Sequence, residues 1–251
     1  MLTLPLAAAF AAAVLFTSFL SGIFGMAGGM ILMGLLLAML PVPTAMLLHG
    51  VTQLASNGWR AWLWRTHVHW RSVRHFGAAA VLTAAAIALL PFTTNKATAL
   101  VVLGLTPLLA LLLPKNLRPD ATRPAHAWVC GFICTVLQLV AGVAGPILDA
   151  FFVHSGMDRK QVVATKASVQ TLSHVLKIIY FGGILAAGGG SVDASVLLIA
   201  VGFAVLGTNL SRRVLDAMDD AQFRRWTQRI VFTTAAIYLT QGLWLTLRGT
   251  A

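Results

Sequence analysis

Two long apolar stretches of the chain are each interrupted by glycine, and this duplication constrains the fold more than any other feature. The first interruption covers residues 21–29 and the second covers residues 141–146. Their glycines include Gly25, Gly28, Gly29, Gly142 and Gly145. Helices broken at corresponding places in two halves of a membrane chain are the sequence feature that best indicates the binding site of a secondary transporter.

A polar stripe follows each break at the same distance along the chain. Within each stripe the residues are spaced by three, one and three positions, so the stripe occupies one face of a helix. The stripes consist of Gln53, Ser56, Asn57 and Arg60, and of Gln170, Ser173, His174 and Lys177. We therefore expect the glycine breaks and the stripes to line one path at bilayer depth.

The composition places the chain in a membrane. Hydrophobic residues make up 58% of its 251 residues and charged residues 10%, against about a quarter charged in soluble domains. A spanning helix needs about 20 apolar residues, and no stretch is polar enough for a soluble domain. The expected segments are 2–40, 44–64, 74–91, 96–113, 125–153, 160–183, 192–210 and 227–247, with breaks in the first and fifth.

The distribution of Lys and Arg indicates how these segments cross. If each broken segment turns back and leaves on the side it entered, the loops 60–74, 114–124, 154–160 and 211–229 share one side. That side then holds 14 of the 18 Lys and Arg residues, as the positive-inside rule requires of the cytoplasmic face. Both termini would be periplasmic. Because half-segments such as 30–40 are short, the hairpins are expected to be re-entrant, with their tips near the midplane.

The resulting prediction is an all-α polytopic membrane protein of two inverted structural repeats. Each repeat has a broken or re-entrant helical hairpin and three transmembrane helices. Residues 1–113 form the first repeat, 114–124 a cytoplasmic linker, and 125–251 the second repeat.

The groups expected inside the membrane suit an anion. Free N–H groups at the start of each restarting helix attract negative charge, and charged residues inside a bilayer are costly and by default functional. Lys166 and Lys177 lie on nearly the same face of one segment, and His49 and Arg60 occupy the equivalent positions in the first half. Two other interpretations stay open: close helix packing for the glycines, and snorkelling to the interface for Arg60 and Lys166.

Acidic and thiol chemistry has less support. Glu is absent, and Asp149 can either pair with a lysine or carry a coupling proton. His174 is a second candidate for carrying a coupling proton. Cys130 and Cys134 share a helix face, which fits two buried thiols or a thiol relay. No Cys/His spacing typical of zinc occurs, so we expect no metal and no cofactor. The net charge of +11 indicates anionic lipid as a partner rather than nucleic acid.

At these residues the chain resembles the TauE/SafE family, the sulfite/sulfonate exporter group. The resemblance rests on Gly25-Met26-Ala27-Gly28-Gly29, on Gln53 with Ser56-Asn57, and on Ala164-Thr165-Lys166 followed by Ser173, and it covers nearly the whole chain. It implies transport of small sulfur-containing or organic anions across the inner membrane by alternating access. Pro146 and His174 depart from the residues expected there.

The sequence thus predicts a non-enzymatic inner-membrane transporter of sulfite, sulfonate or a related carboxylate, able to form a homodimer. The predicted substrate-binding residues are Gly25, Gly28, Gly29, Gln53, Ser56, Asn57, Gly142, Gly145, Lys166, Gln170, Ser173, His174 and Lys177. Three alternatives stay open: an anion channel, an intramembrane enzyme or thiol relay using Cys130 and Cys134, and a membrane scaffold that transports nothing.

Overall fold

A computed structural model describes residues 4–90, 92–112, 119–152 and 155–249, and these residues form a bundle of helices without a strand. This confirms the predicted all-α class. The helices are α1 (Leu4–Phe24), α2 (Met26–Met39), α3 (Val42–Leu63), a 3-10 turn (Arg65–His67), α4 (Trp70–Ala88), α5 (Lys96–Leu112), α6 (Pro124–Val140), α7 (Gly145–Phe152), α8 (Arg159–Ala187), α9 (Ala194–Ala217) and α10 (Asp220–Leu247). Residues 114–118 of the predicted linker lie outside the described residues.

The surface of the bundle is that of a membrane protein. Large apolar side chains such as Leu89 and Phe132 point outward, whereas polar residues such as Gln53 and Lys177 are buried. In the described residues, four helices are long and apolar enough to cross a membrane: α1, α8, α9 and α10. The chain is therefore a multi-pass membrane protein. An apolar exterior suits lipid, and polar groups at bilayer depth are tolerated only inside the protein.

The two breaks fall where the glycines predict them. Gly25 alone separates α1 from α2, and residues 141–144 separate α6 from α7. Both links depend on a residue with a positive φ angle, Gly25 at 64° and Gly142 at 81°, which side chains other than glycine rarely tolerate. The offset in sequence between these two glycines equals the offset between Gln53 and Gln170. The breaks are therefore equivalent positions of the two halves.

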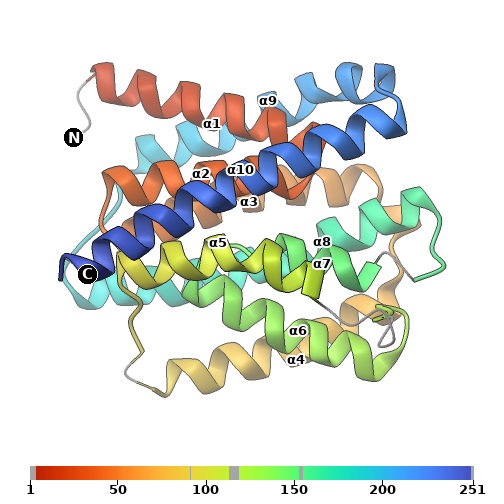
Figure 1. Cartoon of the computed structure of the whole chain (residues 1–251), viewed down its shortest axis with the longest axis horizontal. Coiled ribbons are helices and arrows are strands. Elements are labelled where there is room, and N and C mark those ends of the chain that lie inside the picture. Colours follow the sequence, from red (N-terminus) through yellow and green to blue (C-terminus); the bar gives the residue numbers. More distant parts are fainter. Residues whose placement is uncertain (1–3, 91, 113–118, 153–154, 250–251) are drawn as a thin grey trace.

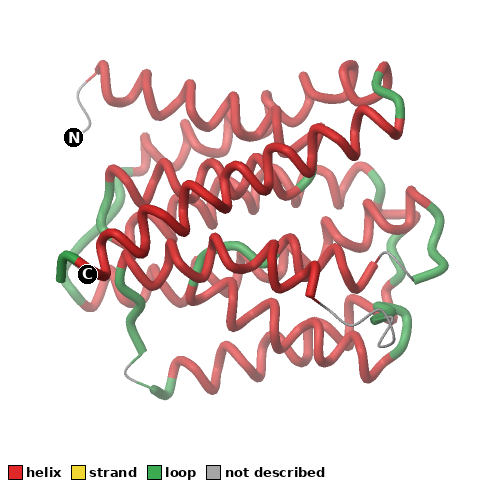
Figure 2. The backbone as a smooth tube through the Cα atoms, viewed as in Figure 1, coloured by secondary structure: helices red, strands yellow, loops and turns green. Residues whose placement is uncertain are grey.

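Each hairpin returns to the end of the bundle from which it started (Figure 1). In that view α1 begins on the left and α2 ends there, whereas α6 begins on the right and α7 ends there. The remaining loops gather at the two ends of the bundle (Figure 2), but residues 141–144 are buried inside it. The right end carries the α3–α4, α7–α8 and α9–α10 connections, and basic residues such as Arg65, Arg159, Lys160 and Arg213 lie in these connections or in the adjoining helix turns. The left end carries Lys96 and Arg248.

Two details differ from the sequence-based expectation. Residues 211–229 were expected to form a loop, but α9 continues to Ala217 and α10 begins at Asp220. The reason is local, because the Asp219 carboxylate accepts a hydrogen bond from the Gln222 N–H (2.7 Å) and caps α10. The first hairpin is also asymmetric. Its arm α1 has 21 residues, about 31 Å at 1.5 Å per residue, so this arm is long enough to span rather than re-enter.

The two halves interlock. Helix α3 packs along α8 and α5 along α10, while α1 packs on α9 and α4 on α6. In chain order α1 corresponds to α6, α3 to α8, α4 to α9 and α5 to α10. Exchanging each helix for its counterpart leaves the pairs α3–α8 and α5–α10 unchanged and turns the pair α1–α9 into the pair α6–α4. The helix packing thus has a two-fold pattern. The antiparallel pair α3–α8 runs through its centre and brings the two polar stripes together.

Candidate functional site

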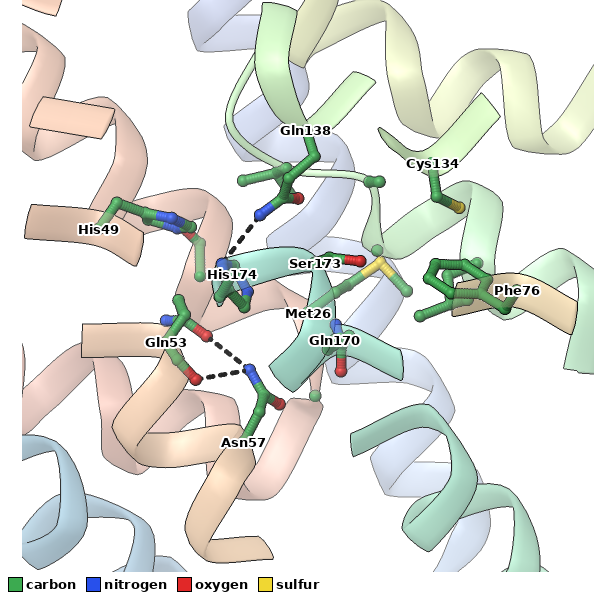
Figure 3. Close-up of a pocket in the computed structure, with 16 residues that line it drawn as sticks. Met26, His49, Gln53, Asn57, Phe76, Cys134, Gln138, Gln170, Ser173 and His174 are labelled. Atoms are coloured by element: carbon green, nitrogen blue, oxygen red, sulfur yellow. Dashed lines mark hydrogen bonds between the residues drawn. The ribbon is translucent and has the colours of Figure 1, made fainter. Parts of the chain in front are cut away.

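A small cavity lies between the two breaks and the two polar stripes (Figure 3). It offers about 30 Å³ to water-sized molecules, which is room for little more than a water molecule. Its lining comes from both hairpins and from α3, α4, α6 and α8. The lining residues are Gly25, Met26, Gly29, His49, Gln53, Asn57, Phe76, Cys134, Gln138, Val143, Ala144, Gly145, Leu148, Gln170, Ser173 and His174.

The first turns of α2 and α7 both contribute to this lining. Gly25, Met26 and Gly29 belong to the start of α2, and Ala144 and Gly145 to the start of α7. Backbone N–H groups in the first turn of a helix have no partner within the helix. The same turn carries the positive end of the helix dipole. The cavity therefore offers two converging helix N-termini to a ligand, which favours a negative one.

Amide side chains supply further hydrogen-bond donors. Asn57 Nδ2 donates to the backbone oxygen of Gln53 (3.0 Å) and to Gln53 Oε1 (3.3 Å), as Figure 3 shows for the pair. This contact fixes the orientation of the Gln53 amide. Its Nε2 group is buried and has no hydrogen-bond partner. A buried donor without a partner is unfavourable by about 1–3 kcal/mol, so Gln53 Nε2 is a donor that a ligand in the cavity can satisfy.

Lys177 lies behind the cavity wall and connects the two breaks. Its side chain is 0% exposed, and its Nζ donates to the carbonyl oxygen of Gly142 (3.0 Å) and lies 3.0 Å from His49 Nδ1. The other ring nitrogen of His49, Nε2, lies 3.0 Å from the carbonyl oxygen of Gly29. When Nδ1 accepts from Lys177, Nε2 carries the proton and donates to Gly29. One lysine and one histidine thus join the first turn of α2 to the second break.

A second histidine completes the polar centre. Gln138 Nε2 lies 2.8 Å from His174 Nδ1, and the rings of His174 and His49 are 5.6 Å apart. Both imidazoles line the cavity, where Figure 3 labels them. Because the Gln138 amide donates to Nδ1, the neutral ring carries its proton on Nε2.

Comparison with known proteins agrees with this geometry. The family model of the sulfite exporter TauE/SafE matches residues 10–239. The chain belongs to the sulfite exporter TauE/SafE family. The match covers both hairpins and both polar stripes, so the resemblance seen in the short motifs extends over nearly the whole chain. Searches of curated proteins and of solved structures give no significant match.

In this family member, eight predicted binding residues line the cavity. They are Gly25, Gly29, Gln53, Asn57, Gly145, Gln170, Ser173 and His174. Gly142 and Lys177 are not part of the lining, but their mutual hydrogen bond lies directly behind it. The helical spacing of the stripes was therefore a good guide to which polar groups converge.

Three predicted binding residues lie elsewhere in the structure. Ser56 is hydrogen-bonded to Thr208 of α9 (2.8 Å), away from the cavity. Gly28 packs against α1, where an added Cβ would meet Thr17 and Ser21. Lys166 forms an ion pair with Asp149 of α7. Asp149, a candidate for proton coupling, is thus held by a lysine outside the cavity.

The structure adds residues that the sequence did not single out for the site. Gln138 and Cys134 belong to α6, one and two turns before the second break, and His49 precedes Gln53 by one turn on α3. Polar residues on the helix that precedes each break are the sequence signal that would have identified Gln138. Cys130 and Cys134 are free and buried, with their sulfur atoms 3.8 Å apart. Within the described ranges, no group of three or more His, Cys, Asp or Glu residues could hold a metal ion.

Proposed function

We propose that the chain carries small (organo)sulfur or related organic anions across the inner membrane by alternating access. The observation that carries this proposal is the cavity itself, which gathers two helix N-termini, the unpaired Gln53 Nε2 group and the Lys177–His49 contact. Donors fixed in a site of low dielectric can replace the hydration shell of an oxyanion. The membership of a transporter family supports the same conclusion.

In this proposal the donors act together on one anion. Gln53 Nε2 and the Gln170 amide bind the anion's oxygen atoms, while Asn57 holds the Gln53 side chain in place. The Ser173 hydroxyl donates to the Val169 carbonyl oxygen (2.9 Å) in this structure and turns toward the anion when it binds. The first turns of α2 and α7 contribute backbone N–H groups. Lys177 supplies positive charge from behind His49, without direct contact. Lys166, Ser56 and Gly28 are not assigned to the ligand, because their contacts lie elsewhere.

The two-fold packing pattern supports an inverted repeat as the basis of transport. The first hairpin starts at one end of the bundle and the second at the other end (Figure 1). An inverted repeat allows the site to open to one side and then to the other while the anion stays near the midplane. A cavity of about 30 Å³ has room for little more than a water molecule, so the helices around it move apart to admit a sulfonate. The end of the bundle with the α3–α4, α7–α8 and α9–α10 connections would face the cytoplasm, and both termini would face the periplasm.

The test is anion flux in proteoliposomes that contain the purified protein. Lys177→Gln removes the buried charge, whereas Lys166→Gln, the matched control, removes a charge that is paired outside the cavity. We expect saturable uptake of radiolabelled sulfite, at least tenfold slower in Lys177→Gln and nearly normal in Lys166→Gln. Equal flux in wild type and Lys177→Gln would contradict the role of Lys177. Single-channel currents would instead indicate an anion channel.

A further inference from the structure

Three basic side chains, Lys177, His49 and His174, lie together beside the cavity. In the described part of the chain, none of their hydrogen-bond partners is a carboxylate. Lys177 Nζ lies 3.0 Å from His49 Nδ1. The His49 and His174 rings are 5.6 Å apart, and His174 and Lys177 are neighbours one turn apart on α8. The other groups that contact these three are neutral: the carbonyl oxygens of Gly29 and Gly142, the Met33 sulfur and the Gln138 amide.

Adjacent like charges in a buried site repel one another strongly. When the cavity holds no anion, a proton added to either imidazole of the cluster of Lys177, His49 and His174 therefore lies against the positive charge of Lys177, which opposes its uptake. An anion in the cavity changes this balance, since its negative charge lies beside both imidazoles. A ligand that raises the proton affinity of a cluster takes up a proton when it binds, and a lower pH then tightens its binding.

We propose that each anion crosses the membrane together with a proton, which the Lys177–His49–His174 cluster takes up as the anion enters the cavity. This inference rests on the proposed function and adds the proton as a second substrate. The proton comes from the aqueous side from which the anion enters and leaves with it on the other side, so no charge remains in the protein. For a singly charged anion the transported pair is electrically neutral, which avoids moving a bare charge through the membrane.

The other titratable groups near the cavity are less suited to this role. Asp149 is paired with Lys166 at the side of α7. The Cys134 thiol lines the cavity, and the titratable group that it contacts in the described part of the chain is the Cys130 thiol. Arg60 belongs to α3, as His49 does, but lies three turns further along that helix. The histidines are the groups that both line the cavity and contact other basic side chains, and histidine is the side chain best suited to exchange protons near neutral pH.

The experiment uses methanesulfonate, an anion that keeps a single negative charge over the whole working pH range. Purified protein is reconstituted in liposomes that contain a pH-sensitive dye. Methanesulfonate uptake and internal pH are then followed together at a clamped membrane potential. We expect acidification of the interior with about one proton per anion, and uptake that responds to a pH gradient but not to the membrane potential.

Substitutions then locate the proton. His174→Gln and His49→Gln each remove one imidazole while keeping a side chain able to form hydrogen bonds, so either should reduce the number of protons per anion at least fivefold in protein that still binds methanesulfonate. Asp149→Asn removes the carboxylate outside the cavity, and His67→Gln removes a histidine of the connection between α3 and α4. Both controls should keep the proton stoichiometry of the wild type.

The outcomes separate this inference from the proposed function. Methanesulfonate or sulfite flux that follows the membrane potential and moves no protons would overturn the proton coupling but leave transport intact. Loss of proton movement in Asp149→Asn, with normal coupling in His174→Gln and His49→Gln, would also overturn the inference. No flux of either anion under any gradient would overturn the proposed function itself. If a histidine variant does not fold, the affinity of the wild type for methanesulfonate tests the inference instead. This affinity should rise as the pH falls, and an affinity that does not change with pH would overturn the inference.

Discussion

At the scale of single residues, the equivalent serines of the two polar stripes have different neighbours. Ser56 and Ser173 occupy the same position of the two stripes, yet Ser56 contacts Thr208 of α9 whereas Ser173 lines the cavity. Helical spacing fixes the face of a helix on which a side chain lies. It does not tell which neighbouring helix covers that part of the face. The sequence could therefore predict that both serines are buried but not which one lines the cavity.

This difference gives a prediction for a matched pair of substitutions. Ser56→Ala removes one hydrogen bond between helices, which in membrane proteins contributes about 0.6 kcal/mol on average. It should lower thermal stability slightly and leave the affinity for sulfite within about twofold of wild type. Ser173→Ala should weaken sulfite binding severalfold, because it removes a hydroxyl from the cavity. Isothermal titration of both variants measures this, and weaker binding in Ser56→Ala alone would contradict the assignment.

At the scale of helices, the glycines of the breaks have two separate purposes. Gly25 and Gly142 permit the positive φ angles that turn the chain. Gly28 instead lets α2 lie directly against α1, because an added Cβ would meet the backbone at Thr17 and Ser21. Both breaks and the two positive-φ glycines were predictable from the sequence, because the same spacing recurs in each half. The close contact at Gly28 was only one of the two interpretations that its sequence context allowed.

The packing role of Gly28 can be tested against a glycine in open space. Gly202 lies within α9, and an added Cβ there would have no atom within 4 Å. Gly→Ala within a helix contributes about 1 kcal/mol of helix propensity at both sites. Gly202→Ala should therefore raise the melting temperature slightly or leave it unchanged. Gly28→Ala should lower it by several degrees, because α1 and α2 must move apart. Equal melting temperatures for the two variants would show that the hairpin does not need this close approach.

At the scale of the whole molecule, loop charge was the most informative sequence signal. The connections that have basic residues in them or in the adjoining helix turns lie together at one end of the bundle, as loop charge predicts, because hairpins that turn back preserve the sidedness of every later loop. Which helices would pack together could not be predicted. Polar stripes show that α3 and α8 face inward, but the pairing of α1 with α9 and of α4 with α6 depends on apolar surfaces that carry little sequence information.

The orientation of the bundle in the membrane gives a further prediction. In a variant with both native cysteines replaced by alanine, Thr66→Cys and Ser191→Cys place single thiols at exposed positions at opposite ends of the bundle. We expect a membrane-impermeant maleimide to label Ser191→Cys in intact cells. Thr66→Cys should react only after the membrane is made permeable, since it lies among the basic loops. Labelling of both thiols from outside would contradict the predicted topology.

The central claim is that a small anion binds in the cavity between the two glycine breaks. The most direct measurement is thermal unfolding of purified wild type and Gln53→Leu in sulfite, sulfoacetate, thiosulfate, sulfate and small carboxylates, with sodium chloride at matched ionic strength. A ligand at 100 times its Kd stabilises the native state by about 2.7 kcal/mol. The account predicts that at least one sulfur oxyanion or sulfonate raises the melting temperature of the wild type by several degrees and leaves Gln53→Leu unchanged. Equal shifts in both proteins, or no shift with any anion, would contradict it.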